Sequence, residues 1–150
     1  RRDRVFGIPW YAYQIARIER GLQEPILRVG HLEDRRNFTH VKDMVRAYWK
    51  AINLCEPGEL YLVGSAREQD THTFREVLEQ LIELSTVSGI KYQTDQRYVR
   101  PTQVPFLICD PSKFCEKTSW QPELGFDRIL TDTLEFWREQ VGAGKVNSAA

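Results

Sequence analysis

The chain has 150 residues, of which 41% are hydrophobic and 28% charged, a composition typical of one globular domain and unlike that of a disordered segment. Twenty-one basic side chains balance twenty-one acidic ones, so no general attraction to nucleic acid or to an anionic membrane is expected. No apolar run approaches the roughly 20 residues that a transmembrane helix needs, and the basic opening residues do not resemble a signal peptide. The three cysteines form no CxxC pair, which favours a reducing, cytoplasmic setting over a disulfide framework or a zinc site.

The first half of the chain alternates helical and extended patterns. A first helix is predicted to end near Gly21, because apolar side chains recur at helical spacing at Tyr11, Ile15, Ile18 and Leu22. Residues 25–30 predict a short strand, and the charged residues 31–37 predict a loop. A second helix begins at Val41 and ends before the Glu-Pro-Gly sequence at 56–58. Its apolar stripe consists of Val41, Met44, Val45, Tyr48 and Ile52.

The second half continues this alternation. Residues 60–64 predict a compact strand, and Thr73 and Glu76 have the spacing of a capping box that starts a third amphipathic helix. Residues 90–93 predict an edge strand, and Asp110 followed by Pro111 favours the start of another helix. The apolar stripes and the tryptophans are interpreted as core. The side chains expected to be buried include Phe74, Leu78, Leu81, Trp49, Trp120, and, on a final helix, Leu130, Leu134 and Trp137.

Together these elements predict a mixed α/β fold with short strands and four or five helices. Counted alone, they form a layer of helices that lacks most of the sheet it should cover. Residues 1–141 are expected to form one structural part, and the small, polar residues 142–150 a flexible tail.

Several catalytic patterns are missing from the sequence. None of the glycines forms the Gly-x-Gly-x-x-Gly turn that binds a dinucleotide between a strand and a helix. No tyrosine is followed four residues later by lysine, the proton-relay pair of short-chain dehydrogenases. His31, His40 and His72 occupy separate loop or helix-start positions, where a structural or solvated role is expected. The chain is therefore predicted to contain no catalytic residue of its own.

Four segments nevertheless carry a family resemblance by their order and spacing. They are residues 27–30 (Leu-Arg-Val-Gly), 36–43 (Arg-Asn-Phe-Thr-His-Val-Lys-Asp), 97–104 (Arg-Tyr-Val-Arg-Pro-Thr-Gln-Val), and 110–113 (Asp-Pro-Ser-Lys) with 120–122 (Trp-Gln-Pro). Together they resemble the C-terminal portion of extended short-chain dehydrogenase/reductases that act on nucleotide sugars. The most similar branch contains GDP-mannose 4,6-dehydratase and GDP-4-keto-6-deoxymannose reductase. The resemblance implies the substrate-binding lobe of a Rossmann-like enzyme.

The same resemblance implies roles for four side chains. Arg36 and Arg100 match arginines that approach the nucleotide diphosphate, an anion suited to the guanidinium fork. Gln103 stands at an acidic position that contacts sugar or ribose hydroxyls, and Arg2 matches an arginine that helps to hold a 2′-phosphate-bearing cofactor. Two structural alternatives stay open for Arg36, which could cap the following helix or pair with Asp43. For Arg2 the alternative is a disordered basic end.

Two departures from the family pattern bear on the substrate. Asn37 stands where the family has aspartate, and Gln103 lacks the usual carboxylate. Trp10 occupies the place of a lysine in the dehydratases, which favours the reductase or a relative.

By resemblance, the parent protein is an enzyme that binds a GDP-sugar and NADP or NAD and performs dehydratase, reductase or epimerase chemistry. The catalytic tyrosine, its lysine and the glycine turn are expected upstream of Arg1, in a Rossmann portion that would also include residues 60–63 in its sheet. A homo-oligomer stays open. The alternative is a non-catalytic nucleotide-sugar-binding or interaction module, and a third reading is a proteolytic fragment without independent activity.

Overall fold

The computed structural model describes residues 4–65, 67–99 and 104–145. These residues form two compact units, each assembled from separate stretches of the chain. The first unit takes Arg1–Asp34, Thr73–Gln103 and Leu130–Ala150, and the second takes Arg35–His72 and Val104–Ile129. The elements in chain order are α1 (Gly7–Glu19), β1 (Ile26–Val29), β2 (Arg35–Asn37), α2 (Val41–Leu54), the 3₁₀ turn η1 (Glu68–Asp70), β3 (Thr71–Thr73), α3 (Phe74–Glu83), β4 (Lys91–Thr94), the 3₁₀ turn η2 (Gln96–Tyr98), β5 (Phe106–Leu107), α4 (Ser112–Thr118) and α5 (Phe126–Gly142).

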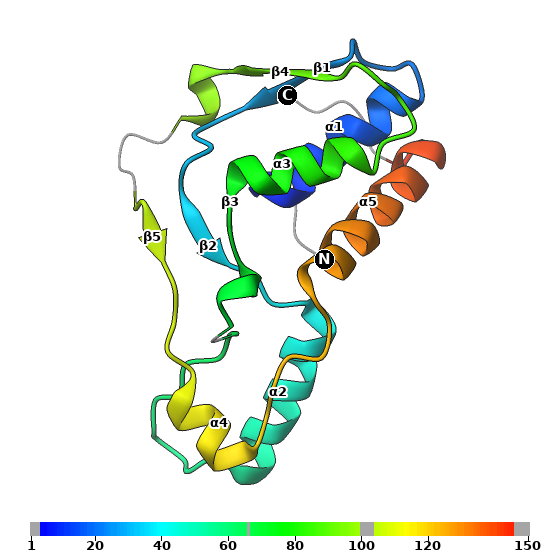
Figure 1. Ribbon diagram of the computed structural model, residues 1–150. Coiled ribbons are helices and arrows are strands. Elements are labelled where there is room, and N and C mark those ends of the chain that lie inside the picture. Colours follow the sequence, from blue (N-terminus) through cyan, green and yellow to red (C-terminus); the bar gives the residue numbers. More distant parts are fainter. Residues whose placement is uncertain (1–3, 66, 100–103, 146–150) are drawn as a thin grey trace. The chain divides into compact units, whose positions relative to one another are not determined.

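The first unit is built on a parallel pair of strands, in which Ile26 of β1 lies opposite Lys91 of β4. Helices α1 and α3 lie side by side next to this pair, in blue and green in Figure 1. The strand predicted at 25–30 and the edge strand predicted at 90–93 are both confirmed, to within one residue at each end. The core of this unit consists mainly of aliphatic side chains, including Ile15, Leu27, Val77, Leu78, Leu81, Leu130 and Leu134.

Local sequence features set the helix ends of this unit. The Thr73 side chain accepts from the Glu76 amide and the Glu76 side chain accepts in return from the Thr73 backbone, so the predicted capping box is present. Gly21 has a φ of +68°, the left-handed conformation that suits glycine just past a helix end. The helix therefore stops before Leu22. This side chain is 56% exposed, so the prediction that it belongs to the apolar stripe of the helix was wrong.

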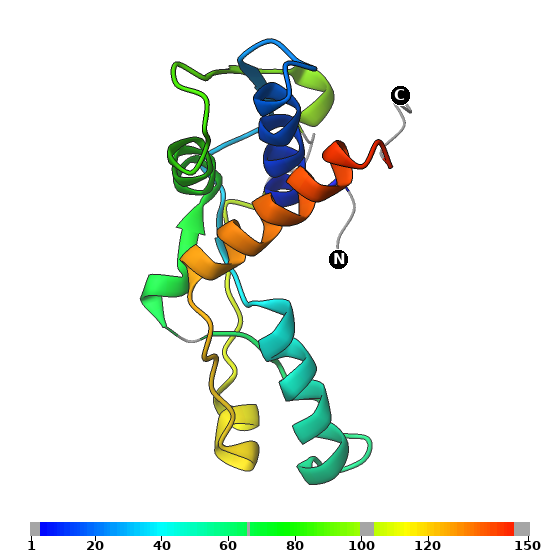
Figure 2. The ribbon, with the colours of Figure 1, turned by 90° about the vertical axis from the view of Figure 1, so that its right-hand side faces the viewer.

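The second unit contains a small sheet in the order β3-β2-β5 and the helices α2 and α4, which lie side by side in Figure 2. Ala47, Phe114 and Trp120 form its core. The prediction of a loop over residues 31–37 was wrong for the last three residues, because Arg35 and Arg36 pair in parallel with Phe106 and Leu107. Helix α4 begins one residue later than expected, and the Asp110 carboxylate accepts from the Ser112 amide at 2.9 Å.

Two further predictions about the second unit were wrong. The apolar stripe of α2 is not core, since Val45 is 60%, Trp49 70% and Ile52 81% exposed. Residues 60–64 form no strand in the described part of the chain. Both errors have one physical cause: the pattern reports which side chains are apolar, whereas burial and strand pairing need a neighbouring element.

Candidate functional site

Two of the four family-like segments meet in the first unit. A Cβ atom added to Gly30 would lie 2.2 Å from the carbonyl oxygen of Tyr98, so only glycine allows this close approach of the two backbones. The Asp95 amide, just before η2, donates to the carbonyl of Val29 at 2.8 Å. Segment 27–30 therefore holds the beginning of segment 97–104 in place through backbone contacts.

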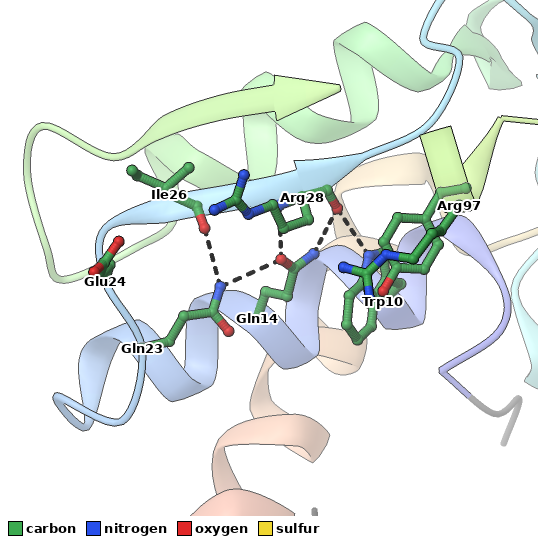
Figure 3. A pocket seen from close by; sticks show the side chains of 8 residues that line it. Trp10, Gln14, Gln23, Glu24, Ile26, Arg28 and Arg97 are labelled. Atoms are coloured by element: carbon green, nitrogen blue, oxygen red, sulfur yellow. Dashed lines mark hydrogen bonds between the residues drawn. The ribbon is translucent and has the colours of Figure 1, made fainter. Parts of the chain in front are cut away.

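The edge of β1 that faces away from β4 is closed by side chains of α1. The buried Gln14 amide accepts from the Arg28 backbone N–H at 2.8 Å and donates to the Arg28 carbonyl at 3.0 Å. The indole Nε1 of Trp10 donates to the same carbonyl at 2.8 Å. Gln23 donates to Gln14 and to the Ile26 carbonyl, which extends the row of amides along the strand (Figure 3). This arrangement is not predictable from the sequence, because no local pattern distinguishes an edge-closing glutamine from a solvated one.

These side chains form the floor of a cavity of about 270 Å³, which we name the edge trough. Trp10 and Tyr98 form an aromatic wall, with ring centroids 5.2 Å apart. Glu24 lies at one end of the trough and Arg97 at the other (Figure 3).

The arginines of the edge trough already have partners. Arg28 Nη1 donates to the Gln93 side chain at 2.5 Å. Arg97 forms a two-pronged ion pair with Asp95, in which Nη2 lies 2.7 Å from Oδ2. Hydrogen bonds from the Arg97 side chain and amide lower the pKa of the Asp95 carboxyl to about 2. The charge of Arg97 is thus balanced by Asp95, whereas the partner of Arg28 is a neutral amide.

The other two family-like segments meet in the second unit, where the buried Asp43 joins segment 36–43 to the loop after residues 120–122. Its carboxylate binds Arg46 and accepts from the amides of Glu123 and Leu124 at 3.2 and 3.0 Å. The Trp120 indole donates to the Asp43 carbonyl at 3.2 Å. Asp43 is therefore a structural residue that ties α2 to the chain between α4 and α5.

Asn37 has a comparable structural role. Its side-chain oxygen accepts from the Ser65 amide at 3.1 Å, and its Nδ2 donates to the Asp70 carbonyl and to Thr71 Oγ1, both at 3.4 Å. An aspartate could accept the first bond but could not donate the others. The asparagine at this position thus fits its surroundings in this chain without any reference to a substrate.

Arg36 lies in β2 opposite Leu107, and its Nη1 donates to the neighbouring Arg35 carbonyl at 2.7 Å. Other residues are seen in the two structural roles that the sequence left open for Arg36. His40 caps α2, and Arg46 pairs with Asp43. Arg2, Arg100 and Gln103 lie outside the described residues. Their roles, and the convergence of Arg36 with Arg100 on one diphosphate, stay predictions.

Each of the three histidines has a neighbour within its own unit. His40 is buried, and its Nδ1 accepts from the Lys42 amide at 3.1 Å. His72 stacks on Phe126 with the ring centroids 3.6 Å apart. His31 lies 3.1 Å from the Asp34 carboxylate.

An exposed apolar surface covers one side of α2. We name it the outer face of α2, and it consists of Val41, Val45, Tyr48, Trp49 and Ile52. Their spacing places them on adjoining positions of one helix side. Leu60 and Leu62, in the same unit, are 77% and 48% exposed. Contiguous apolar surface of this kind commonly marks a site of contact with another protein segment.

Within the described ranges, no glycine-rich turn joins a strand to a helix. The same ranges contain no group of three or more acidic, histidine or cysteine side chains placed to hold a metal ion. They also contain no helix that is both long and apolar enough to cross a membrane.

Solved structures with the same fold are extended short-chain dehydrogenase/reductases. The structure of RMD from Pseudomonas aeruginosa in complex with NADPH aligns with a TM-score of 0.83 and 27% identity, over 93% of this chain and 44% of that protein. A dTDP-glucose 4,6-dehydratase from Bacillus anthracis in complex with NAD shares the fold, with a TM-score of 0.69 and 24% identity over 91% of this chain and 40% of that one. The described fold is the C-terminal part of these Rossmann-like enzymes.

The profile of the GDP-mannose 4,6 dehydratase family matches residues 1–133. The chain therefore belongs to this family. Among its relatives, GDP-6-deoxy-D-mannose reductase from Pseudomonas aeruginosa is 30% identical over 91% of this chain and 43% of its own length. GDP-mannose 4,6 dehydratase from Cricetulus griseus is 27% identical over 90% of this chain and 40% of its own length. The chain thus spans less than half the length of these relatives.

Proposed function

We propose that this chain is the nucleotide-sugar-binding part of an NAD(P)-dependent enzyme that dehydrates a GDP-sugar or reduces its 4-keto product. The observation that carries the proposal is the pairing of the family segments, with 27–30 against 97–98 in one unit and 36–43 against 120–124 in the other. Such internal consistency supports a preserved binding lobe. The two enzyme names among the relatives supply the reaction classes.

In this proposal, Arg36 and Arg100 bind the diphosphate through charge-assisted hydrogen bonds. Gln103 contacts hydroxyl groups of the sugar or the ribose, because an amide both donates and accepts. Arg2 assists the cofactor, which is NADPH in one related structure and NAD in another. The cofactor supplies hydride chemistry when bound, and the role of this chain is to hold and orient the sugar nucleotide.

The catalytic tyrosine, its lysine and the glycine turn belong, in this proposal, to an upstream portion of the same protein. The outer face of α2 supports this view, since Trp49 and Ile52 are among its most exposed apolar side chains. A sheet of the upstream portion would cover this face, and residues 60–63 would join that sheet as a further strand. The cytoplasm is the proposed compartment, because all three cysteines are free thiols.

The isolated 150-residue chain is expected to have no dehydratase or reductase activity, because the relay pair and the glycine turn are missing from its sequence. The measurement is turnover of GDP-mannose and of its 4-keto product, with NADP(H) and NAD(H), by the purified chain. The full-length protein assayed in parallel is the positive control. Measurable turnover by the isolated chain would refute the assignment of catalysis to the upstream portion.

Removing the guanidinium group of Arg36 or Arg100 is expected to weaken GDP binding by about 1.5–3 kcal/mol, or ten- to a hundredfold, because each loses a charge-assisted contact. Arg100→Lys should also weaken binding, since the ammonium group of lysine does not reproduce the bidentate hydrogen bonds of a guanidinium group. The measurement is a GDP titration of the full-length protein and its Arg36→Ala and Arg100→Ala variants. Arg128 is an exposed arginine outside the family segments, so Arg128→Ala is the matched control. Unchanged affinity in both test variants would contradict the diphosphate assignment.

The second candidate is a binding module that keeps the sugar-nucleotide site without catalysis. The exposed apolar side chains on the outer face of α2 favour retaining this alternative, since such surface commonly marks contact with another protein segment. The reading frame upstream of Arg1 separates the two. A frame that continues into a glycine turn and a Tyr-x-x-x-Lys pair supports the enzyme, whereas a start codon at this point supports the module.

A further inference from the structure

A cluster of hydrogen-bonded polar side chains lies beside strand β2 in the second unit. We name it the Asn37 cluster, and it consists of Asn37, Ser65, Arg67, Asp70 and Thr71. Ser65, Asp70 and Thr71 are buried. Buried polar groups are costly unless they bond to one another, and a network of such bonds holds its members in one arrangement. The cluster therefore fixes the segments that meet in it.

One side of the cluster is the loop that follows Gly64. The Asp70 carboxylate accepts from the Ser65 hydroxyl and, at 2.7 Å, from Nε of Arg67. The charges of Arg67 and Asp70 thus oppose each other. The Ser65 hydroxyl oxygen also accepts from the Arg67 amide at 3.1 Å. This loop is consequently held in shape by its own side chains.

Asn37 joins the loop to the end of β2. Its side-chain oxygen accepts from the Ser65 amide, and its Nδ2 donates to the Asp70 carbonyl. The amide of the next residue, Phe38, donates to the same carbonyl at 2.9 Å. A Cβ atom added to Gly64 would lie 3.2 Å from the Asn37 side-chain oxygen, closer than an ordinary van der Waals contact. The loop and the strand end are therefore in close contact through the side chain of Asn37.

Arg36 precedes Asn37 in the same strand. Consecutive side chains of a strand lie on opposite faces, so the face of β2 that carries Arg36 is opposite to the face held by the cluster. A change in the contacts of Asn37 shifts the backbone that both residues share. Bidentate binding of an anion depends on the position of the guanidinium group, and such a shift would weaken it.

We propose that Asn37 is a positioning residue for Arg36, because its hydrogen bonds to the cluster hold β2 where the guanidinium group can bind the diphosphate. This inference rests on the proposed function, in which Arg36 contacts the diphosphate, and it assigns no contact between Asn37 and the ligand. An amide suits the role, since it accepts from Ser65 and donates to the Asp70 carbonyl. A carboxylate at position 37 would instead turn a negative oxygen towards that carbonyl.

The test is a double-mutant cycle on the full-length protein, followed by calorimetric titration with GDP and with inorganic pyrophosphate. Asn37→Ala is expected to weaken both ligands by about tenfold, because a displaced guanidinium group loses part of its charge-assisted bonding. In the Arg36→Ala background the same change should alter both affinities by less than about twofold, since no guanidinium group is left to place. Gln69→Ala removes an exposed amide from the neighbouring turn η1 and should leave both affinities unchanged.

Thr71→Val is a milder variant, because it nearly keeps the shape of the side chain and removes the acceptor of one Asn37 bond. It should weaken both ligands by a smaller factor than Asn37→Ala, and again only where Arg36 is present. If Asn37→Ala does not fold, the cycle of Thr71→Val with Arg36→Ala decides the question.

Two outcomes would overturn the inference alone. Equal losses with and without Arg36 would mean that Asn37 acts on the fold and not through Arg36, and unchanged affinity of Asn37→Ala would mean that it positions nothing. Unchanged affinity of Arg36→Ala would instead refute the diphosphate role in the proposed function, and the inference with it.

Discussion

Leu78→Ala is expected to lower the free energy of unfolding by about 2–5 kcal/mol, because it leaves a cavity in the core of the first unit. Leu78 is fully buried on α3, together with Val77 and Leu81. The measurement is chemical denaturation followed by far-ultraviolet circular dichroism.

Leu84→Ala provides the matched control, since Leu84 stands at the end of the same helix and is 41% exposed. It should cost clearly less than Leu78→Ala. A loss below about half a kcal/mol for Leu78→Ala, which is ordinary for a surface position, would mean that the buried face of α3 is wrongly assigned.

Asp43→Ala should destabilise the second unit by about 3 kcal/mol. The change removes the acceptor of the Glu123 and Leu124 amides, and partly buried donors without partners are costly. Asp43→Asn keeps one acceptor oxygen and should cost less than the alanine variant. The measurement is the denaturation midpoint of each variant at neutral pH.

Glu116→Ala serves as the control for Asp43→Ala, because it removes an exposed carboxylate from α4 in the same unit. Its effect should stay within about half a kcal/mol. If Asp43→Ala and Glu116→Ala had equal effects, the carboxylate of Asp43 would not hold the chain between α4 and α5, and this part of the fold description would be incorrect.

The parts of the fold that were predictable from sequence are those decided by neighbours along the chain. The capping box of Thr73 and Glu76 involves residues three positions apart, and it was confirmed together with the start of α3. The expected burial was confirmed for Leu78, Leu81, Leu130, Leu134, Trp120 and Trp137, whereas Phe74 is half-buried. Regular apolar spacing identifies the face of a helix that will avoid water, and in these cases the unit itself supplies the covering element.

The errors arise where a distant segment decides the outcome. Strand β2 exists because Arg35 and Arg36 pair with Phe106 and Leu107, about seventy residues away, and no pattern within 31–37 encodes that pairing. Trp49 was expected to be core because tryptophan is usually covered, yet nothing in the described part of the second unit covers it.

The candidate site likewise combines features that the sequence predicts with features that only contacts between distant segments decide. The four family-like segments were identified from the sequence by resemblance, but the meeting of 27–30 with 97–98 was not predicted, and it becomes visible only in the close approach at Gly30. Gln14, Gln23 and Glu24 were not singled out, because each resembles an ordinary polar surface residue until the free edge of β1 is placed beside it. Arg36 is placed in β2, and its role towards a diphosphate awaits the titration.

The interleaving of the two units has a consequence for the synthesis of the protein. Both units contain segments from either side of residue 100, and the first unit is complete only when the residues after Leu130 are present. A ribosome releases a chain from its N-terminus onward, and domains usually fold as soon as they have emerged whole. Neither unit can therefore fold early during translation. The first unit is completed only when α5, which carries the buried Leu130 and Leu134, leaves the exit tunnel.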